Sequence, residues 1–189
     1  RSNDILPDVV DDVILDLFAA ETGQLMAFVR YLVGSSLDKI SPLINKRIAY
    51  ELERRILTPY LERNDYWWMG YGEKQVNNWD PWCNSNCIWA FLLGCNDDEK
   101  RIAAIEKAID SLDIFIGVYH ADGACDEGPR YWNRAAGALL DSLEAMHIAT
   151  GGEVDVFNKP LIAEMGRFIS RARIYNDSYL NFADSSAVC

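Results

Sequence analysis

Residues 118–132 have the sequence VYHADGACDEGPRYW and join two segments with strong helical patterns. The stretch is crowded with ionisable and aromatic side chains, whereas loops that only connect helices are usually shorter and carry fewer such groups. Pro129 suits the first position of a helix, where its missing N–H costs nothing. The sequence therefore predicts a functional loop here, followed by a helix that starts at Pro129 and holds Tyr131 in its first turn.

Helical periodicity continues on both sides of this loop. The preceding helix is expected to begin at Asn96, with Glu99 three residues later completing a capping box. Its expected buried stripe is Ile102, Ile105, Ile109, Leu112 and Ile116. After the loop, one helix is marked by Ala136, Leu139, Leu143 and Met146 and ends at Gly151-Gly152, and the last is marked by Leu161, Met165, Phe168 and Ala172.

The N-terminal half shows the same kind of pattern. We expect helices over residues 8–20 and 22–32, the second closed by Gly34, and a third from Ser41-Pro42 to Tyr60. Residues 64–79 are irregular, and a further helix is predicted with Asp80 as N-cap and Pro81 as first residue, running to Gly94. No segment alternates with period two between hairpin turns, so the fold class is all-α.

Antiparallel helical pairs joined by short loops fit either a compact bundle or an α/α hairpin array. Two chemically rich loops each precede a helix, one at Asn77-Asn78 and one at Glu127. An α/α toroid gathers such loops at one mouth, so we favour an incomplete toroid.

Composition limits the partners of the protein. The chain has 189 residues, half of them hydrophobic, and its 18 Lys+Arg against 29 Asp+Glu give a net charge of −11. Such a charge disfavours nucleic acid and anionic membranes. No apolar run reaches the roughly 18 residues of a membrane span. Because the first residue is Arg1, we expect a piece of a longer chain.

Five cysteines occur without a CxxC pair: Cys83, Cys87, Cys95, Cys125 and Cys189. Cys83 and Cys87 are one helical turn apart, but no further ligand stands at suitable spacing. We expect free, partly buried thiols, no metal site and no cofactor.

Two pairs of polar residues are candidates for chemistry. The amides of Asn77 and Asn78 could bind a carboxylate at a helix start, or could simply cap the next helix. Glu127 and Tyr131 are four residues apart across the junction of loop and helix. A tyrosinate in a first helical turn is stabilised by the helix dipole, and Arg130 and Arg134 could add to this, which would let Tyr131 act as a base. The alternative is a surface glutamate and a core tyrosine.

Aromatic residues and histidines add further candidates. Trp67, Trp68, Tyr71 and Trp79 could form a platform on which sugars stack, or could be core beneath a long loop. His120 is the better candidate for proton transfer, whereas His147 is expected to be a packed histidine.

The run Asp122-Gly123-x-x-x-Glu127-x-x-x-Tyr131, preceded by the run Asn77-Asn78-Trp79-Asp80-Pro81-Trp82-Cys83-Asn84-Ser85-Asn86, resembles the heparinase II/III-like family of polysaccharide lyases. The closing Phe182-Ala183-Asp184 resembles the junction to that family's β-sandwich. The resemblance covers most of the chain from about Tyr66 onward.

The resemblance implies an α/α toroid fragment over residues 1–176 and, over 177–189, the start of the junction to a missing β-sandwich domain. It implies cleavage of a uronate-containing polysaccharide, such as a glycosaminoglycan, by β-elimination in the periplasm or outside the cell. In that chemistry Tyr131 matches the catalytic tyrosine, Asn78 or Asn77 the position that neutralises the carboxylate, and Glu127 an acidic residue of the same mouth. We expect the fragment alone to be inactive.

Two tryptophans depart from the family pattern. Many relatives carry histidine where this chain has Trp79 and Trp132, so proton transfer would pass to His120 or to the missing domain. The net charge favours a less sulfated substrate. Two alternatives stay open: a toroid that only binds glycans through Trp67, Trp68 and Trp79, and a glycoside hydrolase that uses two of Asp122, Asp126 and Glu127.

Overall fold

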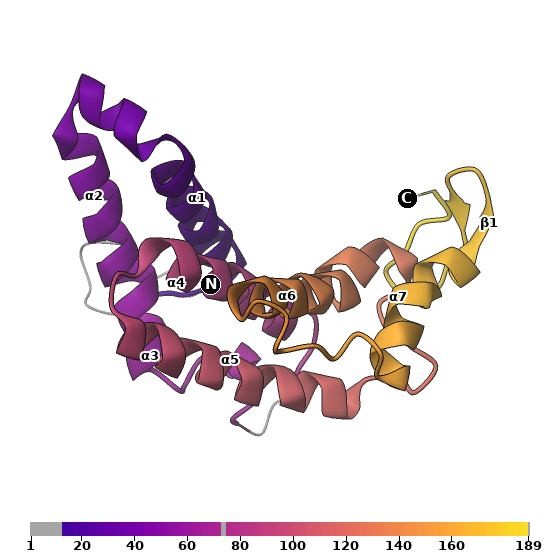
Figure 1. Cartoon of the computed structure of the whole chain (residues 1–189). Helices are drawn as coiled ribbons and strands as arrows, with labels where there is room; N and C mark the ends of the chain where they lie inside the picture. The colour runs from indigo at the N-terminus through magenta and orange to yellow at the C-terminus, as the bar shows by residue number, and fades with distance from the viewer. Residues whose placement is uncertain (1–12, 73–74, 189) are drawn as a thin grey trace.

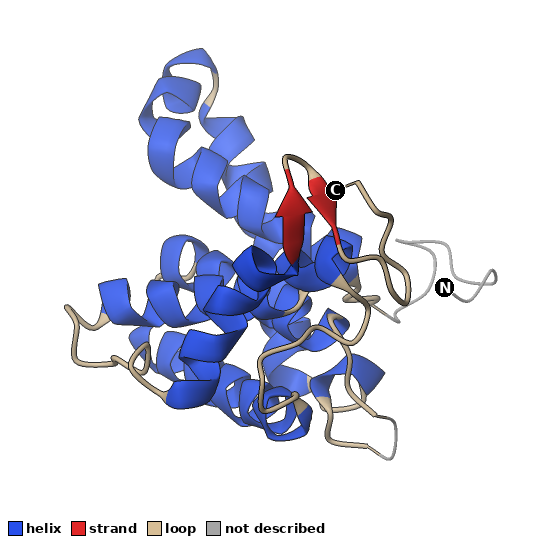
Figure 2. Cartoon of the chain, turned by 90° about the vertical axis from the view of Figure 1, so that its right-hand side faces the viewer, coloured by secondary structure: helices blue, strands red, loops and turns tan. Residues whose placement is uncertain are grey.

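The computed structural model describes residues 13–72 and 75–188, and it is mostly helical (Figures 1 and 2). The all-α prediction is therefore confirmed. The helices are α1 (Leu17–Ile40), α2 (Pro42–Leu52), the π-helix η1 (Glu53–Leu57), α3 (Thr58–Glu62), the 3₁₀ turn η2 (Trp67–Met69), α4 (Trp79–Gly94), α5 (Asp98–Val118), the 3₁₀ helix η3 (Pro129–Arg134), α6 (Ala136–Ala149) and α7 (Pro160–Ala172). A small antiparallel hairpin of β1 (Arg173–Tyr175) and β2 (Ser178–Tyr179) follows α7.

Helix α4 lies at the centre of the molecule, with α1 and α2 on one side and α6 and α7 on the other (Figure 1). It packs against α1, α5 and α6. Its buried residues include apolar Ile88 and Phe91 but also Asp80 and Asn84, which are fully buried. A polar group in such a position must be hydrogen-bonded to be tolerated. The centre of the fold is therefore partly a polar network.

Helix α1 is one continuous helix, so the predicted break near residue 21 and the predicted end at Gly34 are wrong. Residues 8–12 of the first predicted helix lie outside the described residues. Gly34 is buried inside α1, and its carbonyl accepts a 2.7 Å hydrogen bond from the Asn45 side chain of α2. Gly23 faces Ile56 so closely that a Cβ there would lie 2.8 Å from the Ile56 side chain. Both glycines allow neighbouring helices to approach, rather than ending the helix.

Helices α2, η1 and α3 form one continuous helical segment. Ser41 caps it, its hydroxyl accepting from the Leu43 N–H at 3.3 Å, and Pro42 is its first residue, as predicted. Pro59 explains the π turn. Proline has no N–H to donate, and its ring conflicts with the carbonyl four residues earlier. The chain widens by one residue instead, so that the Thr58 N–H bonds to the Glu53 carbonyl, five residues back.

Three predicted details around α5 and α6 are corrected. Asp97, not Asn96, caps α5, its carboxylate accepting from the Lys100 N–H at 3.2 Å. Ile102 is 60% exposed and Ile109 38% exposed. The buried face of α5 consists instead of Ala104, Ala108, Ser111, Leu112 and Phe115. Pro129 starts a 3₁₀ helix, and the α-helix begins only at Ala136.

The cysteines agree with the prediction where the structure describes them. Cys83, Cys87, Cys95 and Cys125 are free and buried. Cys189 lies outside the described residues.

Candidate functional site

The loop before Tyr131 is held in place by two glycines. Gly123 has φ +76° and lies against α7, where a Cβ would be 2.3 Å from the Glu164 carbonyl carbon. Gly128 has φ +88° and lies against the C-terminal segment, where a Cβ would be 2.5 Å from the Phe182 carbonyl oxygen. Only glycine fits both the positive φ and the close approach. The loop therefore has a fixed position between α7 and residues 182–185.

A second set of contacts fastens the same loop. The Arg171 guanidinium of α7 donates to the Asp122 carbonyl and pairs with the Glu164 carboxylate. The Arg130 N–H donates to the Ser185 hydroxyl at 3.0 Å. Chemistry carried by this loop is thus presented from a rigid support.

The two motifs that precede α4 and η3 meet in space. The Asn78 side-chain amide donates a short hydrogen bond to the Glu127 carboxylate, across 49 residues of sequence. Asn78 is 6% exposed and Glu127 is partly buried. The structure therefore brings together one predicted site residue from each motif.

Asn77 and Asn78 have different roles although they are adjacent. Asn77 is exposed, and its side-chain oxygen accepts from the Trp79 N–H at 3.0 Å, which is a local capping contact. Asn78 is the N-cap residue by backbone position, but its side chain makes no cap hydrogen bond. Asp80, the predicted N-cap, is instead the second residue of α4 and is fully buried, so that prediction is wrong. Asn77 thus satisfies the helix start and leaves the Asn78 amide to reach Glu127.

Glu127 has an unusual environment for a carboxylate. Burial raises its pKa above the ordinary value, and the neighbouring charges of Asp184 and Asp126 raise it further. Nothing within the described residues offers it a cationic partner. A carboxyl group of this kind holds a proton more readily than a surface glutamate, which suits a role in proton transfer.

Tyr131 lies in η3, four residues after Glu127, and is partly buried against the core. The predicted first turn of an α-helix is wrong, because η3 is a six-residue 3₁₀ helix, too short for the dipole effect we expected. Within the described part of the chain its hydroxyl makes no hydrogen bond. Trp132 beside it donates from Nε1 to the Met165 carbonyl at 2.8 Å.

Arg134 is fixed by α1 and α4 rather than by Tyr131. Its guanidinium lies 4.0 Å from the centre of the Trp82 ring and donates to the Glu21 carboxylate at 2.9 Å. The Trp82 Nε1–H donates to the same Glu21 oxygen at 2.8 Å. A stacked and paired guanidinium keeps its plane fixed and its remaining N–H groups free for an anion. Glu21 and Trp82 were not predicted, because no local pattern marks them.

The four aromatic candidates separate into one core residue and three residues that reach the surface, among them Tyr71, which is 40% exposed and donates to the Lys107 carbonyl at 3.0 Å. Trp68 is 1% exposed, stacks on Tyr66 and donates from Nε1 to the Leu15 carbonyl at 2.9 Å. Its predicted role in sugar stacking is therefore wrong, since no ring face is open. Trp67 is 36% exposed and Trp79 is partly exposed, and their ring centres are 5.1 Å apart. These two rings form the candidate stacking surface.

The two histidines have different surroundings. His120 pairs with the Asp126 carboxylate at 2.6 Å, and both side chains are mostly exposed. His147 is partly buried, with Nδ1 2.9 Å from the Val154 carbonyl and the Phe157 ring edge-on to it. Among residues 13–72 and 75–188, no group of three His, Cys, Asp or Glu side chains is arranged to hold a metal ion. In the same residues no helix is long and apolar enough to cross a bilayer.

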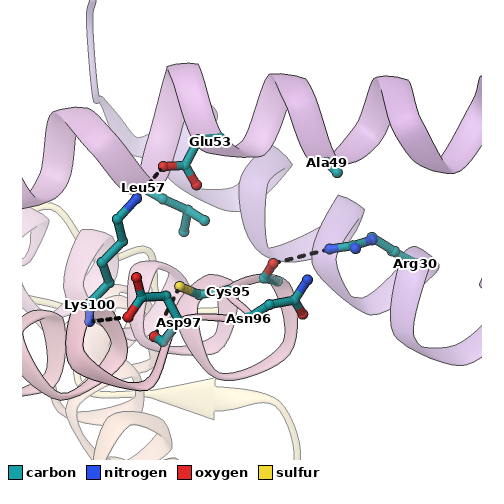
Figure 3. A pocket seen from close by; sticks show the side chains of 9 residues that line it. Arg30, Ala49, Glu53, Leu57, Cys95, Asn96, Asp97 and Lys100 are labelled. Atoms are coloured by element: carbon teal, nitrogen blue, oxygen red, sulfur yellow. Dashed lines mark hydrogen bonds and ion pairs between the residues drawn. The ribbon is translucent and has the colours of Figure 1, made fainter.

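A separate cavity of about 310 Å³ lies at the other end of α4 (Figure 3). Its walls come from α1, the α2–η1 segment and the α4–α5 connection, and the lining residues are Arg30, Ala49, Glu53, Leu57, Gly94, Cys95, Asn96, Asp97 and Lys100. Lys100 pairs with Glu53 at 2.8 Å, and Arg30 donates to the Gly94 carbonyl at 3.1 Å. Because α4 rises about 1.5 Å per residue over 16 residues, this cavity is about 24 Å from Asn78. It contains none of the predicted site residues.

No protein-family model matches the chain, and no curated protein sequence matches it.

Proposed function

We propose that the chain is part of a polysaccharide lyase, an incomplete α/α toroid that cleaves a uronate-containing polysaccharide by β-elimination. The observation that carries this proposal is the hydrogen bond between Asn78 and Glu127. It joins the two sequence motifs that resemble heparinase II/III-like lyases, and Tyr131 follows on the next turn of chain. The domain boundaries, with residues 177–189 leading to a β-sandwich, belong to the same proposal.

The Asn78–Glu127 pair suits the first requirement of β-elimination. The hydrogen on C5 of a uronate is acidic only when the neighbouring carboxylate is neutralised. A protonated Glu127 can donate its hydrogen to that carboxylate while the Asn78 amide donates a second one. The raised pKa of Glu127 supports this role, because an ionised glutamate would repel the substrate.

Tyr131 is the proposed base and acid. It takes the C5 hydrogen, the C4–O4 bond breaks as the C4–C5 double bond forms, and O4 leaves with a proton. His120, in its pair with Asp126, is a further candidate for proton transfer on this loop. His120 and Tyr131 belong to the same twelve-residue stretch, residues 120–131.

Substrate binding is assigned to surface groups around this corner. Trp67 and Trp79 offer ring faces to a sugar, and the free N–H groups of Arg134, with exposed Arg130, offer hydrogen bonds to anions. Asp126 and Asp184 close to Glu127 favour a sparsely sulfated polymer. The missing β-sandwich would close the cleft, and a periplasmic or secreted location is part of the proposal.

The test is a screen of the full-length protein on hyaluronan, alginate, polygalacturonate and heparan sulfate. The unsaturated uronate product is followed by its ultraviolet absorbance. Tyr131→Phe should abolish product, whereas Tyr175→Phe, at a 72% exposed position on the hairpin, should leave the rate unchanged. Equal rates for Tyr131→Phe and the parent would remove Tyr131 from the mechanism.

One observation favours a second candidate, a toroid that binds glycans without cleaving them. The Tyr131 hydroxyl has no hydrogen-bonding activator in the described residues, while the Trp67–Trp79 pair is exposed. In that case Trp67→Ala and Trp79→Ala would weaken glycan binding in calorimetry, and no unsaturated product would form. Trp68→Ala is not used, because Trp68 is core. A saturated reducing end with incorporated water would instead indicate a hydrolase.

A further inference from the structure

Asp80 is enclosed in the interior without an opposite charge. It is 0% exposed, as is Asn84, and Ser111 of α5 is 1% exposed. Asp80 Oδ1 accepts from Asn84 Nδ2 at 3.2 Å, and Asp80 Oδ2 lies 2.9 Å from Ser111 Oγ. Within the described residues no cation pairs with it. An ionised carboxylate in such a position is costly, and the neutral acid is the form that fits.

The hydrogen bonds of Asp80 extend to the aromatic turn. Ser111 Oγ is 3.0 Å from the carbonyl oxygen of Met69, the last residue of η2. The same short turn carries Trp67, whose ring contacts Trp79. Asp80 is thus connected through one serine to the proposed stacking surface.

The Ser111 hydroxyl has one hydrogen to donate and two alternative acceptors. Ser111 has one hydroxyl hydrogen but two acceptors in reach, the Asp80 carboxyl and the Met69 carbonyl. When Asp80 is protonated, it donates to Ser111, and Ser111 donates to Met69. When Asp80 is ionised, Ser111 donates to Asp80, and the buried Met69 carbonyl loses its donor. Asn84 does not compensate, since its two N–H groups already reach Asp80 and Ser111.

The other titratable groups around Asp80 do not neutralise it. Tyr60 of α3 donates to Asn84 Oδ1 at 2.7 Å, and burial raises its pKa. Burial likewise raises the pKa of Tyr71, to about 12, with contributions from the charges of Asp110 and Asp80. Burial also raises the pKa of Cys83 on α4. These three groups are neutral near pH 7.

The cation of α5 on this side is also engaged elsewhere. Lys107 Nζ donates to the Leu61 carbonyl at 3.3 Å and the Arg63 carbonyl at 2.7 Å. Burial lowers the pKa of Lys107. The neighbouring tyrosines and Cys83 are uncharged, and Lys107 is bound elsewhere. Asp80 therefore has no counter-ion among the described residues.

We propose that Asp80 is a positioning residue for the Trp67–Trp79 surface: its uncharged form leaves the Ser111 hydroxyl on the Met69 carbonyl and holds η2 in place, and loss of the proton releases that turn. The inference rests on the proposed function only in taking this surface as the sugar-binding one. Burial raises the pKa of Asp80 to about 7, so the change falls at neutral pH.

The experiment is an NMR titration of the 189-residue chain without any sugar, so its outcome does not depend on lyase activity. The Asp80 carboxyl carbon, the Trp67 indole N–H and the Gly70 amide, which shares the Met69 peptide bond, are followed from about pH 5 to about pH 9. We expect one shared midpoint near neutral pH for all three signals.

Two variants and one control separate the steps. Asp80→Asn keeps the shape and hydrogen-bond donor of the protonated acid, so the Trp67 and Gly70 signals should no longer change with pH. Ser111→Ala should uncouple them from Asp80. Glu127→Gln removes the other nearby carboxyl group whose pKa is raised. It should leave the shared titration midpoint of the three NMR signals unchanged. An Asp80 carboxyl already ionised at about pH 5, or an unchanged Trp67 titration in Asp80→Asn, would overturn the proposal.

Discussion

Asp80 and Glu127 are two carboxyl groups with similar partners and different surroundings. Each accepts a hydrogen bond from an asparagine side chain, Asn84 for Asp80 and Asn78 for Glu127, and burial is the main cause of the raised pKa in both. Asp80 is completely enclosed and also bonds Ser111. Glu127 is only partly buried and has two further acids near it.

The difference shows what each carboxyl group is suited for. Around a protonated Asp80 every polar hydrogen has an acceptor. The group therefore stabilises the fold and has no unused hydrogen-bond donor or acceptor to offer a ligand. Around Glu127 negative charge is in excess, and within residues 13–72 and 75–188 its carboxylate accepts from the amide of Asn78 alone, so a ligand can change its partners at little cost. Burial of the whole network therefore separates a structural acid from a candidate functional one.

The largest expected effect is the pH dependence contributed by Asp80. Its pKa is about 7 in the folded protein against an ordinary 3.8, so as the pH rises from about 4 to about 7 the unfolded chain loses this proton first and stability falls. The loss is at most about 4 kcal/mol, at about 1.4 kcal/mol per pKa unit. Asp80→Asn should lack this loss and be more stable than the parent at about pH 8.

Urea unfolding at several pH values measures this difference. The comparison of parent with Asp80→Asn cancels the contribution of the other carboxyl groups. Parallel pH profiles for the two proteins would show that Asp80 is ionised in the fold, and the contrast with Glu127 would disappear.

The second effect compares the two asparagines. Asn84→Ala removes partners from Tyr60, Ser111 and Asp80 together, and we expect a loss of about 3 kcal/mol in the free energy of unfolding. Asn78→Ala removes one hydrogen bond to a partly exposed carboxylate and should cost about 1 kcal/mol. Urea unfolding of both variants and the parent at one pH measures the two losses of stability. Equal losses would mean that burial does not distinguish the two networks.

Sequence reasoning predicted the helices and the meeting of the two motifs. Periodicity located the segments that became α4, α5, α6 and α7, and Ser41-Pro42 marked the start of α2. The two loops were expected at one mouth because both precede helices, and a hydrogen bond between Asn78 and Glu127 joins them. Signals that are local along the chain were sufficient for these features.

The predictions were wrong where contacts between residues far apart in the sequence determine a helix end or a buried face. Gly34 resembles a helix end, but Asn45 from another helix bonds it inside α1. Ile102 follows the apolar period, yet α5 turns its small residues Ala104 and Ala108 inward. Trp68 and Trp67 are chemically identical neighbours, and contacts with distant residues, such as the Leu15 carbonyl, bury Trp68 in the core.

The third effect concerns the support of Glu127. At Gly128, φ is +88° and a Cβ would also lie 2.6 Å from Ser185 Cβ, so Gly128→Ala should cost about 2 kcal/mol and detach residues 182–185. Gly151→Ala is the matched control, since φ there is +62° and a Cβ would meet nothing within 4 Å. It should cost about 1 kcal/mol. Hydrogen exchange of the Arg130 amide, which donates to Ser185, reports the detachment. Unchanged exchange in Gly128→Ala would show that the segment does not depend on this contact.

The smallest expected effect is that of Glu127→Gln. The Asn78 amide can donate to the new side-chain oxygen, so the contact between the motifs is kept. Because the folded pKa of Glu127 is raised, its ionised form is disfavoured in the fold. The variant should therefore be slightly more stable than the parent at about pH 8, by less than about 1 kcal/mol, and equal to it at about pH 4. Urea unfolding at these two pH values measures the difference. A clear loss of stability at pH 8 would mean that the Glu127 charge holds the loop in place, and Glu127 would then resemble Asp80 as a structural group.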